Sequence, residues 1–126
     1  MKRAIATGII FFSMLIILIF SLSYLNDSCK ELSKINNALR NQVEKENWKG
    51  SAQLLEDFSR SWEKRSIIIT VFVHHQELDV LSEEIVRTKT YIKEQEKVDA
   101  LAAISTVDFQ LKHIIDLEKV NIQNIF

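Results

Sequence analysis

One continuous apolar stretch near the N-terminus constrains the fold of this chain more than any other feature. Residues Ala4 to Leu25 read AIATGIIFFSMLIILIFSLSYL and include no charged side chain. The hydrocarbon core of a bilayer is about 30 Å thick, and roughly 20 helical residues span it. A helix satisfies its own backbone hydrogen bonds, which lipid cannot do for an irregular chain. We therefore expect this stretch to cross a membrane as one helix.

The N-terminal stretch could also be a cleaved signal peptide or the leader of a lipoprotein, and in either case the mature protein would lack this helix. A cleaved signal peptide has an apolar run of about 7 to 15 residues and small residues before the cut, for which Ser21 and Ser23 are the candidates. The run here is longer, which favours a retained signal-anchor. A lipoprotein acylated at Cys29 is disfavoured, because residues 26–28 read NDS instead of an apolar and small-residue motif. If the N-terminus is cleaved, the protein is instead a secreted helical protein.

Basic residues predict the orientation of the anchor. Lys2 and Arg3 precede the apolar stretch, and such residues favour the cytoplasmic side of a membrane helix. A long following domain crosses the membrane largely regardless of its own charge. We therefore expect a single-pass protein of the cell membrane, with residues 1–25 as the anchor and residues 26–126 as an extracytoplasmic domain.

The composition of the chain favours helices and argues against several classes of function. The chain has no proline, two glycines and a formal net charge of −1. Hairpins need turn residues that are scarce here, and phosphate-binding loops and nucleophile elbows need glycines at fixed positions. A basic face interleaved with aromatic residues, typical of nucleic-acid binding, is missing from the pattern. We expect an all-α domain with no enzymatic activity, no cofactor and no nucleic-acid partner.

Apolar residues recur at spacings of three and four through the domain, which is typical of amphipathic helices. Ser28 and Glu31 have the Ser-x-x-Glu spacing of a capping box, which predicts a helix start. A polar cluster at residues 44–47 predicts the first break, with Asn47 or Ser51 capping the next helix. The predicted architecture is an N-terminal transmembrane helix followed by a small antiparallel four-helix bundle of two helical hairpins. The four predicted helices begin at Ser28, near Trp48, near Ser66 and near Leu101, and the last three end after Trp62, at Lys93 and near Asp116.

The stretch of residues 66–73 is rich in β-branched residues, which favour strands. A strand needs a partner, and no second run of this kind lies outside the apolar stretch. An apolar stripe also continues through this region, from Ile67 and Val71 to His74 and Leu78. We therefore predict one long helix from about residue 66 to residue 93.

Histidines and acidic residues gather in the middle of the chain. On a helix, His75 and Asp79 stand one turn apart and are the weak candidates for a metal site, with His113 as a third ligand. No His-Glu-x-x-His or Cys/His pattern accompanies them, so we expect no metal. Glu83 and Glu84 are expected on an exposed helix face.

Cys29 is the only cysteine in the chain. Its position just beyond the apolar stretch would allow an intermolecular disulfide between two parallel anchors. The alternative is an unpaired thiol at the start of a helix. An internal disulfide is excluded.

Three short motifs resemble an uncharacterised bacterial family, found largely in Firmicutes. They are HQELD at residues 75–79, YIK at residues 91–93 and NIQNIF at residues 121–126. The family is the domain of unknown function number 4363, and the likeness covers nearly the whole chain. The family has no assigned activity, so the resemblance implies no mechanism. It implies a membrane-anchored location and a helical architecture. The resemblance also implies a buried polar network that docks the tail. Its expected members, taken from the matching motifs, are His75, Glu77, Asp79, Asn121 and Asn124.

These observations favour an extracytoplasmic interaction or assembly module on a membrane anchor. The expected partners are the membrane, through Ala4 to Leu25, and another protein or a second copy of the chain. A ligand- or metal-sensing helical bundle is the alternative function.

Overall fold

Four helices account for nearly all of the residues that the structure describes. The structure is a computed structural model, and it describes residues 1–123, without the side chains of residue 2 and of residues 120–123. No strand occurs within residues 1–123, so the expected all-α class is confirmed. The helices are α1 (Lys2–Glu44), α2 (Trp48–Ile69), α3 (His75–Lys93) and α4 (Lys97–Gln123).

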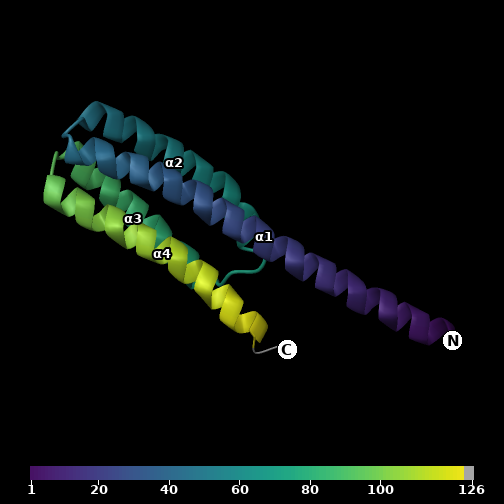
Figure 1. The fold of residues 1–126 in the computed structure, drawn as a ribbon. Coiled ribbons are helices and arrows are strands. Elements are labelled where there is room, and N and C mark those ends of the chain that lie inside the picture. The colour runs from purple at the N-terminus through teal and green to yellow at the C-terminus, as the bar shows by residue number, and fades with distance from the viewer. Residues whose placement is uncertain (124–126) are drawn as a thin grey trace.

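The helices form an antiparallel four-helix bundle from which the N-terminal half of α1 projects (Figure 1). α1 packs on α2 and α4, and α3 packs on the same two helices, so neighbours in the chain are neighbours in space. This up-and-down order agrees with the two predicted hairpins. We call the end of the bundle from which α1 projects the proximal end, and the opposite end the distal end.

α1 runs without a break from the apolar segment, residues 4–25, into the bundle. The predicted helix start at Ser28 is therefore wrong. Ser28 is buried, and its hydroxyl accepts a hydrogen bond from Arg65 Nη1 of α2 at 3.1 Å instead of capping a helix. Serine and glutamate three residues apart also fit the interior of a helix, and no proline or glycine follows until Gly50 to end one. The apolar segment and the first bundle helix are one rod.

Two of the three connections lie where the sequence predicts them. α1 and α3 each end within a polar cluster, and the residues that follow, Glu46 and Gln95, take the left-handed conformation with φ of 56° and 59°. Such a residue commonly ends a helix. Asn47 caps α2 as expected, because its side-chain oxygen accepts a hydrogen bond from the backbone N–H of Gly50 at 3.1 Å.

The long helix predicted for residues 66–93 is wrong, because the chain turns at residues 70–74 and α3 is a separate helix. Ile67 and Val71, which the predicted stripe places inward, are 70% and 81% exposed. β-branched residues are stiff and weaken a helix locally. The turn lets α3 pack back on α2 and buries Val73 in the core. The spacing of three and four residues between apolar side chains therefore continues through residues 70–74 although these residues do not belong to a helix.

α4 is longer than predicted, since it passes the expected end near Asp116 and runs to Gln123. Its later turns lie against the apolar segment of α1, where Ile115 and Leu22 line the same cleft. The longer α1 therefore gives α4 a longer surface to follow. The tail that was expected to fold back against the bundle falls on residues 120–126, whose side chains lie outside the description.

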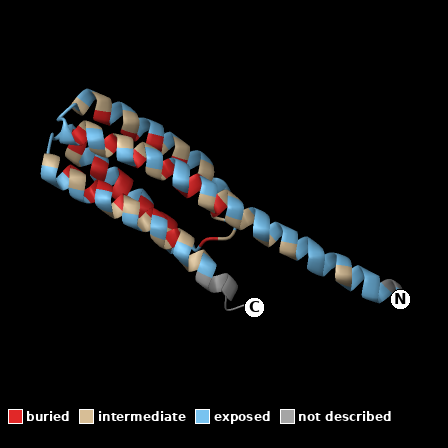
Figure 2. Cartoon of the chain, viewed as in Figure 1, coloured by how far each residue is buried: buried red, intermediate tan, exposed pale blue. Residues whose placement is uncertain are grey.

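Inward-facing side chains of all four helices form one core, seen in Figure 2 as buried bands on the facing sides of the helices. Phe58 and Trp62 of α2 are 1% and 6% exposed, as their helical spacing predicts. Trp62 also donates a hydrogen bond from Nε1 to Ser82 Oγ of α3 at 3.1 Å. The aromatic stripe of α2 is therefore a packing element of the bundle.

Candidate functional site

The apolar segment of α1 is exposed or half-buried as far as Tyr24, and its last residue, Leu25, is buried. Of the helices described, α1 is the one long and apolar enough to cross a membrane, and its most apolar window is wholly unburied. Phe12, Ile17 and Phe20, for example, are 66%, 67% and 69% exposed. Soluble proteins rarely leave a contiguous apolar surface of this extent uncovered. The segment therefore needs an apolar environment that the bundle does not supply.

The end of α2 and the turn that follows it add apolar surface at the proximal end. Ile67, Ile68 and Val71 are 70%, 46% and 81% exposed. Ile69, the last residue of α2, is buried in the core cluster that contains Leu25, the last residue of the apolar segment. Figure 1 shows the turn beside the point where α1 leaves the bundle. The exposed apolar side chains of residues 67–71 therefore lie at the end of the bundle from which the exposed half of α1 projects.

Arg65 fixes the end of α2 to α1 at this level. Its guanidinium donates to the hydroxyls of Ser28 and Ser61, at 3.1 and 3.2 Å, and forms an ion pair with Glu31. Because two of these partners are on α1, the position of the turn relative to the apolar segment is fixed by directional bonds as well as by packing.

Polar side chains also set the register between α1 and α4. Asn36 is buried, and its Nδ2 donates to the backbone carbonyl of Ile104 at 3.0 Å. One turn away on either side, Ser33 donates to Asp108 at 3.3 Å and Arg40 donates to Ser105 at 3.2 Å. The buried amide of Asn36 has a hydrogen-bond partner when α1 and α4 are in this register, and sliding of one helix along the other would leave the amide without it.

Cys29 lies in the core of the bundle, 1% exposed. Burial raises the pKa of its thiol to about 11, although the nearby Arg65 charge acts in the opposite direction. A thiol in such surroundings is a poor nucleophile, because the thiolate is the reactive form. The intermolecular disulfide suggested by the sequence would require this thiol to leave the core.

We predict that iodoacetamide alkylates Cys29 of the folded chain at about pH 8 roughly a hundredfold more slowly than an ordinary cysteine, because raising the pKa from 9.0 to about 11 lowers the fraction of thiolate by about that factor. The measurement is mass spectrometry of the detergent-solubilised full chain over time, before and after denaturation. Asn37→Cys provides an exposed control cysteine in the same helix. Equal alkylation rates at the two positions would contradict the buried placement.

The residues at the start of α3 do not form the site that their spacing suggests. His75 and Asp79, the weak metal candidates, are both exposed. In the described part of the chain, no group of three or more His, Cys, Asp or Glu side chains is placed to hold a metal ion. The prediction that His75 and Asp79 are buried in a polar network is wrong, because Leu78 takes the inward position of this turn.

Glu77 is the member of that predicted network that contacts another helix. Its Oε2 lies 3.7 Å from Nε2 of His113 on α4. His113 in turn stacks on Phe109, with ring centroids 5.9 Å apart. The side chain of Asn121 and the whole of Asn124 lie outside the described residues. The contact between Glu77 and His113 joins α3 to α4 at the surface.

Glu84 is buried, 8% exposed, although the sequence predicts an exposed face there. Its Oε1 lies 3.0 Å from Arg87 Nη1, so Arg87 pairs with Glu84 and not with Glu83. Helical geometry turns position 84 toward α4, where it lines a small cleft with Tyr91 and Asp99. A carboxylate taken out of water needs a charged partner, which Arg87 provides.

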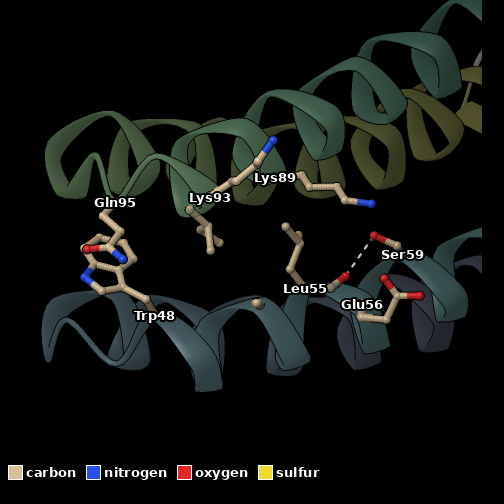
Figure 3. A pocket seen from close by; sticks show the side chains of 9 residues that line it. Trp48, Leu55, Glu56, Ser59, Lys89, Lys93 and Gln95 are labelled. Carbon is tan, nitrogen blue, oxygen red and sulfur yellow. Dashed lines mark hydrogen bonds between the residues drawn. The ribbon is translucent and has the colours of Figure 1, made fainter.

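A larger cleft of about 420 Å³ lies between α2 and α3 at the distal end. Figure 3 shows Trp48, at the start of α2, facing Gln95 from the turn after α3. Leu55 and Ile92, both buried, give the cleft an apolar floor. Clefts of this size and composition accommodate small molecules or the side chains of a docked helix.

Charged side chains line the two sides of this distal cleft. Lys89 and Lys93 come from α3, whereas Glu56 and Ser59 come from α2 (Figure 3). Neither lysine and no oxygen of Glu56 has an ion-pair partner within residues 1–123. The Ser59 hydroxyl donates to the carbonyl of Leu55 at 2.8 Å. An apolar floor with unpaired charges at its rim suits a partner that has both kinds of group.

Trp48 packs against the core at the side of the cleft and is half-buried there. The signal that could have predicted the cleft is Ala52, which also lines it. Ala52 continues the spacing of three and four residues between Trp48 and Leu55, and a larger side chain at this position would fill the space between α2 and α3.

The comparisons with known proteins support one assignment. The family model described as domain of unknown function (DUF4363) matches residues 19–125, which include the end of the apolar segment and the bundle. No curated protein and no solved structure matches the chain. Because the family model covers most of its length, the chain belongs to the family of this domain of unknown function.

Proposed function

We propose that the protein is a single-pass membrane protein whose helical bundle is an interaction module on the extracytoplasmic side. The observation that carries the proposal is the continuity of α1. One unbroken helix has an unburied apolar half and a half that packs in the bundle. A bilayer would cover the first half and hold the second upright above its surface. The proposal includes no catalytic step and no cofactor.

The orientation in this proposal rests on the residues that precede the apolar segment. Lys2 and Arg3 are the basic residues at that end, and the distribution of basic residues favours their retention in the cytoplasm. The bundle is then on the opposite side of the cell membrane. The apolar turn at the proximal end supports a bundle that rests on the bilayer, because Val71 would otherwise be exposed to water.

If the bundle rests on the bilayer, a fluorophore at position 71 will contact lipid. In the Cys29→Ala background, we predict that a cysteine-linked fluorophore at Val71→Cys is quenched by lipids that have spin-labelled acyl chains near the headgroup. The same label at Val86→Cys is the control. Val86 is 65% exposed on α3, about 16 Å further along that helix than its first residue, and should not be quenched. Equal quenching at both positions would contradict the seating of the turn on the membrane.

The distal cleft is the surface that this geometry would offer to a protein partner. It lies at the end of the bundle remote from the apolar segment, between Trp48 and Lys93. An amphipathic helix that lays its apolar face on Leu55 and Ile92 would bring its polar flanks to the charged rim. We propose such a helix, from another protein or from a second copy of the chain, as the occupant.

Site-specific photocrosslinking tests this placement. A photoreactive amino acid at Ala52, which lines the cleft, should give one discrete crosslinked product in native membranes. The neighbouring exposed position Gln53 is the matched control, because it is rotated about 100° around α2 and does not line the cleft. We expect the product from position 52 and not from position 53. No product from either position, or the same product from both, would contradict a partner in this cleft.

A ligand-sensing bundle is the second candidate function, and the same cleft favours it. Its volume of about 420 Å³ lies in the range of small-molecule sites. A small ligand bound in the cleft would react with the photoreactive group at position 52, but it would not link two chains. The mass of the crosslinked product therefore distinguishes the two candidates.

A further inference from the structure

A second groove runs between α1 and α4 at the proximal end. Its lower part, about 280 Å³, is lined by the apolar side chains of Leu22, Leu25 and Ile115 together with Lys119. Its upper part, about 450 Å³, shares Ile115 and Lys119 and extends to Lys30 and further lysines. Because the two parts share lining residues, they form one groove that is apolar toward the projecting half of α1 and basic toward the bundle.

The basic part has more positive than negative side chains. Four lysines line it, with Asp116 as the acidic lining residue. Lys112 pairs with Asp108 at 2.9 Å and Lys119 lies 3.7 Å from Asp116. The remaining two lysines of the groove come from α1, are exposed and make no ion pair with any residue that the structure describes; they are Lys30 and Lys34. The groove therefore has an unneutralised positive charge.

The position of the groove along α1 relates this charge to a bilayer. Leu25 lies about 33 Å along the helix from Arg3, close to the thickness of a hydrocarbon core. The apolar part of the groove is then level with the ends of the acyl chains nearest the headgroups. Lys30 and Lys34 lie about 8 and 14 Å beyond Leu25 along the same helix. The flexible stem of a lysine lets its ammonium group reach a headgroup phosphate in this layer.

We propose that this groove binds an anionic phospholipid of the surrounding membrane. One acyl chain would lie along Leu22, Leu25 and Ile115, and the phosphate would be bound by Lys30, Lys34 and Lys119. The inference rests on the proposed insertion of α1 in a membrane, but it adds a ligand of defined chemistry. Along α1, the apolar channel at Leu22 and Leu25 is followed by the cationic site at Lys30 and Lys34, which is the order of acyl chain and headgroup in such a lipid. On the antiparallel α4, Lys119 lies about 6 Å from Ile115 toward the membrane, and its flexible stem lets the ammonium group reach back to the phosphate.

Native mass spectrometry of the full chain from nanodiscs tests the proposal. The nanodiscs contain phosphatidylcholine with a minority of phosphatidylglycerol. We expect the wild-type chain to retain phosphatidylglycerol in preference to phosphatidylcholine. The variant K30Q/K34Q/K119Q should bind it on the order of a hundredfold more weakly, from the typical contribution of three basic side chains near an anionic headgroup.

The matched control is K45Q/K49Q/K97Q, which removes the same charge at the distal end, outside the distal cleft, and should retain the lipid as the wild type does. Circular dichroism should show that both variants are as helical as the wild type. Phosphatidylglycerol with a photoactivatable group in one acyl chain should label peptides that contain Leu22 or Ile115. Equal binding of the two lipids by the wild type, equal loss in both triple variants, or labelling confined to residues 4–21 would overturn the proposal.

Two further measurements separate the possible failures. Extraction at alkaline pH first establishes whether the chain is embedded. A chain that is released contradicts the proposed function itself, whereas an embedded chain without lipid preference contradicts only the groove. Glycerol 3-phosphate added in solution should not displace the lipid, because it lacks the acyl chain. Full displacement by this soluble anion would identify a phosphate site and not a lipid site.

Discussion

Phe58→Ala is expected to lower the free energy of unfolding of the bundle by about 3 to 5 kcal/mol, the usual cost of removing a buried phenylalanine side chain. Phe58 is 1% exposed in the middle of α2 and belongs to the core shared by the four helices. Its loss leaves a cavity that stiff helix packing fills only in part. Urea denaturation of the detergent-solubilised full chain, followed by tryptophan fluorescence, measures the change, because Trp62 lies one helical turn away.

The control for this prediction is Phe109→Ala, which makes the same change on the surface of α4. Phe109 is 64% exposed, and its ring stacks on His113. Surface substitutions usually change stability by no more than about 0.5 kcal/mol, and the stacking adds at most about 1.5 kcal/mol. A loss at Phe109 as large as that at Phe58 would show that the arrangement of α2 and α4 described above is wrong.

Asn36→Asp is expected to destabilise the bundle by about 3 kcal/mol or more at neutral pH, because it places an unpaired charge inside the structure. The Asn36 amide donates to the carbonyl of Ile104 at 3.0 Å and is 1% exposed. A carboxylate at this position has no proton to donate and faces a carbonyl oxygen, so a favourable contact becomes a repulsive one. Thermal denaturation of the full chain in detergent measures the loss.

Asn37→Asp is the matched control, since residue 37 is exposed on the same helix and its substitution should change stability by no more than about 0.5 kcal/mol. Acidification should restore part of the stability of Asn36→Asp, because a protonated carboxyl group can donate to the Ile104 carbonyl. Similar losses for the two variants, or no recovery at low pH, would contradict the buried hydrogen bond between α1 and α4.

The number of helices and two of their three connections follow from the sequence. Polar clusters at residues 44–47 and 93–97 interrupt the apolar spacing, and the chain turns within both. The turn at residues 70–74 was not predicted, because Ile67 and Val71 continue the apolar spacing of their neighbours although both are exposed. Spacing alone cannot distinguish a side chain that faces a core from one that would face lipid.

The junction between the apolar segment of α1 and the bundle shows a similar limit. Ser28 and Glu31 have a spacing that fits a helix start, but they lie inside α1, and each accepts a bond from Arg65. That role depends on the position of α2, which the sequence around Ser28 and Glu31 does not determine. Only packing decides which of the two interpretations holds.

The candidate sites were less predictable than the fold. The distal cleft and the groove between α1 and α4 are each lined by residues of two helices that are distant in sequence, such as Trp48 with Lys93 and Lys30 with Lys119. The motif-based expectation for His75 and Asp79 was wrong, since both are exposed. Four lysines spread over α1 and α4 give no local signal, and only the antiparallel packing of these helices brings them together.

The central claim, a bundle held outside the cell by the apolar half of α1, is tested most directly by labelling intact cells with a membrane-impermeant maleimide. In the Cys29→Ala background, one variant is Lys45→Cys, at the distal end of α1, and the other has a cysteine inserted between Met1 and Lys2. We predict labelling of Lys45→Cys in intact cells, and labelling of the inserted cysteine only after the cells are permeabilised. Labelling of the inserted cysteine in intact cells, or of neither position, would contradict the account.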